Sequence, residues 1–206
     1  MTSSQTTPPQ ARDRIYRSPA GIAGGVVLIL VGAWLGSDAV VSGGGRTPWT
    51  VLAGLLFVVP LVVAFTIRPA VFGNEERLRV RNPFRDVTLP WSAVSGLKSG
   101  YSNEVVDEAG TKYQLWSIPV SLRGRRKAQR QQLRTAKGGR TPMGASGLPV
   151  TVPRSTGDQT MAELRELHET HAASEAAQGT PKVRWAYEII APALVGAVLL
   201  VVLIAL

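Results

Sequence analysis

Long apolar runs alternate along the chain with polar, arginine-rich stretches. Three runs contain almost no charged residues: residues 22–41, 49–67 and 185–206. A helix of about 20 residues rises about 30 Å, which matches the hydrocarbon core of a bilayer. Soluble domains instead spread their apolar residues at the short periods of strands and helices. The pattern therefore predicts an integral membrane protein with three transmembrane helices.

The first two spans should form a helical hairpin, because only the glycine-rich residues 42–48 separate them. Four glycines of the first span share one face, where two helices can approach closely. They are Gly21, Gly25, Gly32 and Gly36. Packing of this face against another span of the same chain is favoured over a homodimer interface.

The distribution of basic residues predicts the orientation. The N-terminal tail carries Arg12, Arg14 and Arg17, the hairpin loop carries Arg46, and residues 68–184 carry 19 of the 23 Lys and Arg. By the positive-inside rule, the tail and the large polar block are cytoplasmic, and the hairpin loop and C-terminus face out. A signal peptide is disfavoured, because the first apolar run is too long and no small-residue cleavage site follows it.

Residues 77–94 (RLRVRNPFRDVTLPWSAV) alternate apolar and polar side chains on both sides of a turn at residues 82–85. This pattern predicts a β-hairpin with one buried face. Further strands are expected near residues 70–72, 94–101, 103–106, 111–120 and 148–152. The segment 111–120 has aromatic residues on both faces, which favours a central strand or one that contacts something outside the sheet.

An amphipathic helix is predicted after the strands. Thr160 and Glu163 form a capping box, and apolar residues recur at helical spacing until the helix fades by Ala177. The periodic positions are Met161, Leu164, Leu167 and His171.

A small bent antiparallel sheet or barrel followed by one helix resembles the pleckstrin-homology (PH) superfold. Residues 17–19 (RSP), 68–72 (RPAVF) and 77–94 resemble the bacterial PH-like family named after the low-molecular-weight protein antigen 6. The resemblance covers about residues 14–120. It implies a PH-like domain beside an N-terminal transmembrane pair, with no enzymatic activity and no settled ligand. A basic insertion at residues 123–147 and the third span depart from that pattern.

The predicted organisation has five parts. They are a cytoplasmic tail (1–19), a transmembrane hairpin (20–68), a PH-like domain with its basic insertion (69–177), a linker (178–184) and a third transmembrane helix (185–206).

The basic stretch, residues 123–140, holds the whole excess positive charge of the cytoplasmic block. Its basic residues are Arg123, Arg125, Arg126, Lys127, Arg130, Arg134, Lys137 and Arg140. Such a segment beside a membrane is drawn to anionic lipids, each cation contributing about 1 kcal/mol. The alternative is a solvated loop that only obeys the positive-inside rule. Nucleic acid is disfavoured, because no aromatic residues are interleaved to stack on bases.

No catalytic, cofactor or metal site is predicted. The chain has no cysteine, and His168 and His171 lie three residues apart without a third ligand, so neither a thiolate nor a catalytic zinc site is expected. Asp38 and Glu188 lie near the ends of their spans, which disfavours a transporter.

These observations predict a non-catalytic scaffold or interaction module, tethered at the inner face of the cell membrane, that recruits a protein partner. The alternative function is an anionic-lipid or envelope-stress sensor acting through the basic stretch.

Overall fold

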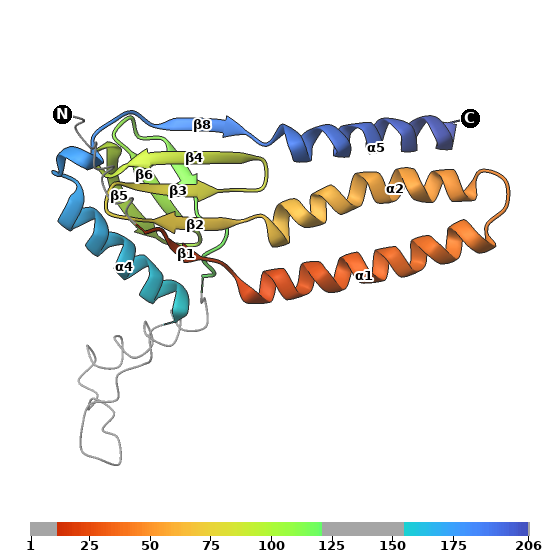
Figure 1. Cartoon of the computed structure of the whole chain (residues 1–206), viewed down its shortest axis with the longest axis horizontal. Coiled ribbons are helices and arrows are strands. Elements are labelled where there is room, and N and C mark those ends of the chain that lie inside the picture. Colours follow the sequence, from red (N-terminus) through yellow and green to blue (C-terminus); the bar gives the residue numbers. More distant parts are fainter. Residues whose placement is uncertain (1–11, 121–154, 206) are drawn as a thin grey trace, which may run out of the picture.

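Residues 12–120 and 155–205 are described by a computed structural model of the chain. Three long helices extend from one end of a β-domain (Figure 1). They are α1 (Pro19–Ser42), α2 (Thr47–Val62), which continues into the π-helical turn η1 (Val63–Ile67), and α5 (Tyr187–Ala205). The basic stretch, the glycine-rich residues that follow it and the strand expected at 148–152 lie outside the described residues.

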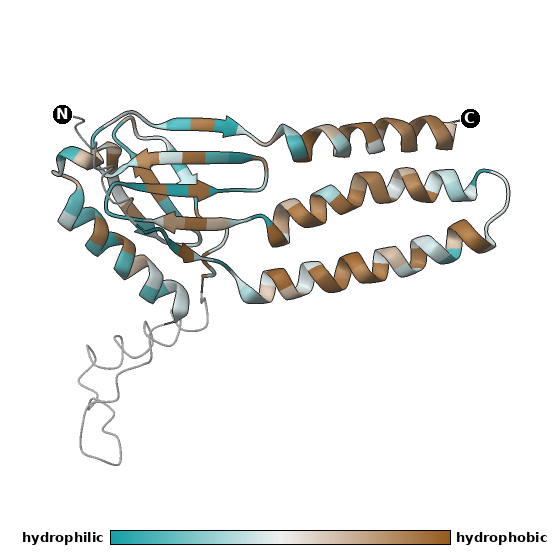
Figure 2. Ribbon diagram, viewed as in Figure 1, coloured by the Kyte–Doolittle hydropathy of each residue, from teal (hydrophilic) through white to brown (hydrophobic). Residues whose placement is uncertain are grey.

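The three helices are long and apolar enough to cross a membrane, as judged by length and composition. Helix α2 lies between α1 and α5 and contacts both (Figure 1). Apolar residues cover most of their length, whereas hydrophilic residues concentrate in the β-domain (Figure 2). Many of the apolar side chains are exposed, including Leu30, Trp34 and Ile204. A surface of this kind suits hydrocarbon rather than water.

The first sheet has the strand order β1-β2-β3-β4-β8, and every neighbouring pair is antiparallel. Its strands are β1 (Arg14–Tyr16), β2 (Ala70–Gly73), β3 (Arg77–Arg81), β4 (Arg85–Pro90) and β8 (Lys182–Trp185). The predicted hairpin is confirmed: Leu78 pairs with Leu89 and Val80 with Val87, and all four side chains are buried.

The strands β1 and β8 were not predicted: the residues of β1 were expected in the tail, and those of β8 in the linker and, for Trp185, at the start of the third transmembrane helix. Both are edge strands of the first sheet, so the sheet extends beyond the expected range 69–177 on either side. Two residues separate β1 from α1, two separate η1 from β2, and Ala186 alone separates β8 from α5. The sheet and the helices are therefore nearly continuous chain segments.

The second sheet contains β5 (Val94–Ser99), β6 (Asn103–Asp107) and β7 (Lys112–Gln114), which pair in that order. The long strand expected at 111–120 is wrong, because β7 ends at Gln114. The Leu115 amide still donates to Asn103 at 2.8 Å, but the Ile118 amide then turns back to the Leu115 carbonyl. Both apolar side chains are buried from this turn rather than from a strand.

Helix α4 (Thr156–His171) packs against β5. The predicted capping box at Thr160 is wrong, since the helix begins four residues earlier. Ser155 is the N-cap: its hydroxyl accepts from the Asp158 amide at 3.2 Å and donates to the Asp158 carboxylate at 2.7 Å. Thr160 is instead buried inside the helix. A short 3₁₀ turn, η3 (Glu175–Ala177), follows.

One hydrophobic core joins the two sheets and α4. Trp91 lies in the 3₁₀ turn η2 (Trp91–Ala93) between the sheets, is fully buried, and donates from Nε1 to the Asn74 carbonyl at 2.7 Å. The core residues are Val71, Leu78, Val80, Val87, Leu89, Trp91, Val94, Val105, Tyr113, Leu115, Ile118, Met161, Leu164, Leu167 and Ala177.

Candidate functional site at the helix end of the domain

The β3–β4 turn, residues 82–84, lies at the end of the domain that faces the helices. Phe84 at this turn meets Phe65 of η1 edge-on, with ring centroids 5.3 Å apart. Phe65 also contacts Trp116, with ring centroids 5.5 Å apart. Aromatic residues from three distant segments therefore meet where the domain joins the helices.

An ion-pair network fixes this junction. The guanidinium of Arg68, just after η1, donates to both carboxylate oxygens of Asp86 in β4 and to the Asn82 carbonyl. It also pairs with Glu188 in the first turn of α5 at 3.0 Å. Since the Arg68 side chain is 8% exposed, one nearly buried cation connects α2, the β3–β4 hairpin and α5.

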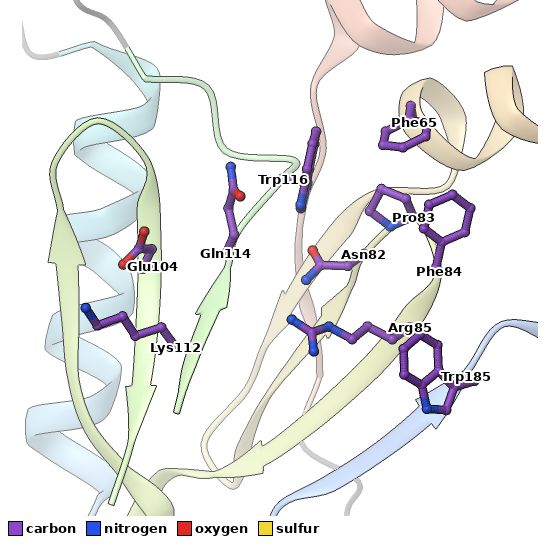
Figure 3. Close-up of a pocket in the computed structure, with 10 residues that line it drawn as sticks. All are labelled: Phe65, Asn82, Pro83, Phe84, Arg85, Glu104, Lys112, Gln114, Trp116 and Trp185. Carbon is purple, nitrogen blue, oxygen red and sulfur yellow. The ribbon is translucent and has the colours of Figure 1, made fainter. Parts of the chain in front are cut away.

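A groove of about 480 Å³ opens beside this junction (Figure 3). Its wall on the first sheet consists of the β3–β4 turn, Arg85 and Trp185. The second sheet contributes Glu104, Lys112 and Gln114, followed in the chain by Trp116. Phe65 closes the side next to α2. The volume lies within the usual range of small-molecule sites.

The side chains of the groove combine large aromatic surfaces with charge. Trp116 is 47% exposed and Trp185 is 51% exposed. Arg85 pairs across the strands with Trp185, and its guanidinium lies 5.5 Å from the Tyr113 ring centroid. The pKa of Tyr113 is raised, mainly by burial and secondly by the nearby Asp107 carboxylate. The Tyr113 side chain beneath Arg85 is therefore neutral at physiological pH.

The four glycines of the first span face α2 and η1 of the same chain. A Cβ at Gly25 would lie 2.7 Å from Thr66 Cβ, and one at Gly36 would lie 2.5 Å from Leu55 Cδ1. Gly32 and Gly21 approach the same two residues less closely. Gly196 of α5 faces the backbone of Leu56 and Phe57 from the other side of α2.

The two histidines lie in different surroundings. His168 Nε2 lies 2.8 Å from the Val94 carbonyl and links α4 to β5. His171 lines a separate polar pocket with Arg12 and Asn74. Within residues 12–120 and 155–205, no group of His, Asp and Glu side chains could hold a metal ion.

The groove was not predicted, because its residues come from five separate segments. One signal pointed toward it: the aromatic residues on both faces of segment 111–120, of which Tyr113 is buried and Trp116 is exposed.

Residues 68–143 match the sequence model of the family described as Bacterial PH domain. This segment is a bacterial PH-like domain. The match includes β2 to β7, whereas β1, α4, β8 and the three helices lie outside it.

The family match agrees with the PH-like resemblance inferred from the sequence. A PH domain indicates a non-catalytic interaction module. The likeness to the antigen 6 family in particular remains a resemblance. The comparison with curated proteins found no match. No solved structure matches the chain either.

Proposed function

We propose that the chain is a non-catalytic interaction module, tethered by three transmembrane helices at the inner face of the cell membrane, which recruits a protein partner through its PH-like domain. In this proposal residues 69–177 form the main part of the domain, completed by β1 and β8. The tail and the domain are cytoplasmic, and the hairpin loop and C-terminus lie outside.

One observation carries the proposal. Three apolar helices leave the same end of the domain, and no more than two residues join each of them to a strand. A domain attached in this way stays at the bilayer surface, and its orientation is restrained at three points. The burial of Arg68 between α2, β4 and α5 supports a fixed arrangement of domain and helices.

An interaction role suits the chemistry of the described residues. The charged side chains at the junction form ion pairs with one another, as expected for a structural element. Among the described residues, the strands β1, β7 and β8 lie at sheet edges and leave backbone groups available for pairing, a common way for small sheets to bind extended segments.

The second candidate function is an anionic-lipid or envelope-stress sensor. Eight basic residues without one acid between Arg123 and Arg140 favour it. In this account the basic stretch detects lipid charge and the helices transmit the signal.

Proximity labelling from the PH-like domain in living cells separates the two functions. The comparison uses the native chain and a variant in which all eight basic residues are replaced by Gln. We expect the same labelled proteins with both chains. Loss of the labelled proteins in the variant alone would contradict the leading proposal and support the sensor.

A further inference from the structure

The groove between the two sheets lies at the level where α2 ends and α5 begins. Phe65 belongs to η1, the last turn of the second apolar helix, and Trp185 lies two residues before α5. If the helices span the bilayer, as the proposed function requires, the groove opens into the headgroup layer of the inner leaflet. Tryptophan is enriched at this depth.

We propose that the groove binds one anionic phospholipid of the inner leaflet, with its phosphodiester at Arg85 and its hydroxyl-bearing headgroup at Asn82. This inference rests on the proposed membrane placement but concerns a site separate from the basic stretch. Three observations support it: Arg85 has no acidic partner among the described residues, Asn82 Oδ1 has no hydrogen-bond donor there, and aromatic residues surround both side chains.

Arg85 is a half-buried cation without an acidic partner among the described residues. By contrast Arg68, Arg79 and Arg81 each lie within 4 Å of a carboxylate. The guanidinium of Arg85 points into the space between the two sheets (Figure 3). A planar guanidinium can donate two parallel hydrogen bonds to a phosphate, which makes an anion its natural occupant here.

Asn82 provides the second polar contact. The residue is 4% exposed and lines the groove, and its Oδ1 has no hydrogen-bond partner in the described part of the chain. A buried carbonyl oxygen without a donor destabilises the folded state, because it has lost its hydrogen bonds to water. A hydroxyl of the lipid headgroup would supply that donor.

The charged residues that line the groove determine which ligand charge it favours. Glu104 and Lys112 both line the second-sheet side, and their opposite charges offset each other. The groove therefore carries one net positive charge, that of Arg85. A phosphodiester with a neutral headgroup carries one negative charge and neutralises it. A zwitterionic lipid would bring a further ammonium group beside Arg85.

The aromatic side chains suit the apolar part of the same ligand. Phe65 is 44% exposed and belongs both to the groove and to the apolar surface of α2. An acyl chain can therefore run from the groove along Phe65 into the hydrocarbon layer without crossing a polar surface. Trp116 and Trp185 then line the glycerol region, where amphipathic indoles are favoured.

Native mass spectrometry of the full-length chain in detergent, titrated with phosphatidylglycerol or phosphatidylcholine, tests the inference. We expect one retained phosphatidylglycerol and weak retention of phosphatidylcholine. Arg85→Gln should weaken binding about tenfold or more, since a charge-assisted contact is lost. The rim substitutions should act in opposite directions, Lys112→Gln weakening and Glu104→Gln strengthening binding by a few-fold.

Arg184→Gln is the matched control, because Arg184 is an exposed cation in β8 outside the groove. Equal losses in Arg184→Gln and Arg85→Gln would overturn the site, as would equal retention of the two lipids. Arg85 also packs near Tyr113, so the exposed Lys112 and the partly exposed Glu104 keep the test valid if Arg85→Gln unfolds. If groove variants lose a labelled protein in cells but keep the lipid, the occupant is a protein and the inference is wrong.

The binding measurement is made in detergent and does not depend on orientation, so its failure is distinguishable from a failure of the membrane topology.

Discussion

Two hydrogen bonds of 3.2 and 3.3 Å join the guanidinium of Arg68 to the carboxylate of Asp86. Arg68 ends the second apolar helix, and Asp86 lies near the start of β4. The same guanidinium reaches Glu188 at the start of α5. The position of the PH-like domain on its helices therefore depends on one almost buried side chain.

Arg68→Gln should lower the free energy of unfolding of the domain by about 1–3 kcal/mol. The substitution leaves Asp86 without its closest cation in a partly buried position. Arg81 is 3.7 Å away but more exposed, and it compensates only in part. Chemical denaturation in detergent, followed by tryptophan fluorescence, measures the effect.

Arg184→Gln provides the control for this effect. Arg184 pairs with the same Glu188, but at 3.9 Å and with 77% of its side chain exposed. Exposed pairs of this kind contribute about 0–1 kcal/mol. A larger loss in Arg184→Gln than in Arg68→Gln would show that burial of Arg68 does not determine the strength of the junction.

Gly25→Val should separate α1 from α2, because its side chain would collide with Thr66. Gly24, its neighbour in the same helix, has no atom within 4 Å of a Cβ position. We therefore expect a lower melting temperature in detergent for Gly25→Val and almost no change for Gly24→Val. Equal melting temperatures would contradict the close packing of these helices.

Tyr16 should make the domain less stable at alkaline pH. The pKa of Tyr16 is raised to about 12, mainly by burial and secondly by the hydrogen bond from its hydroxyl to Glu163. In the unfolded chain the tyrosine pKa is about 10, so only the unfolded state loses the proton between these values. The stabilising contribution of Tyr16 is complete below pH 10 and is lost as the pH rises toward 12.

Denaturation midpoints of the native chain and Tyr16→Phe, measured between pH 9 and pH 12, check this effect. Their difference should shrink as the pH rises, because the variant cannot ionise at this position. Tyr113 titrates in both chains and cancels in the comparison. A constant difference across this interval would mean that the contact between Tyr16 and Glu163 is not maintained.

Trp91→Ala should destabilise the domain by about 3–5 kcal/mol, since it opens a cavity at a fully buried site between the two sheets. It also removes the donor to the Asn74 carbonyl. Trp116→Ala should cost about 1 kcal/mol or less, because that ring is half exposed. Thermal unfolding of the two variants compares them directly, and similar losses would show that Trp91 is not the centre of the core.

The parts of the fold that could be predicted are those with a repeated local pattern. The apolar spans and the alternating strands around residues 82–85 each contain their signal within one window of sequence. Strand β1 has only three residues and pairs with β2, from which α1 and α2 separate it in the chain. No local period identifies such a strand. Residues 182–185 adjoin an apolar span, so their charges and Trp185 indicated a membrane boundary rather than β8.

The groove depends even more on long-range structure. Leu115 and Ile118 continue the apolar pattern of β7, but a turn buries them, and this turn leaves Trp116 exposed beside Phe65. Arg85 is one of five arginines between residues 68 and 85. Only the folded arrangement distinguishes it from Arg68, whose carboxylate partners come from β4 and α5.

Cysteine accessibility tests the central claim most directly, because the chain contains no native cysteine. Gly44→Cys places a thiol in the hairpin loop, where a Cβ meets no atom within 4 Å. Tyr101→Cys places one in the domain, at a side chain that is 98% exposed. In intact cells a membrane-impermeant maleimide should label Gly44→Cys at once and Tyr101→Cys only after permeabilisation. Labelling of Tyr101→Cys in intact cells, with Gly44→Cys protected, would contradict a PH-like domain held at the inner face of the membrane.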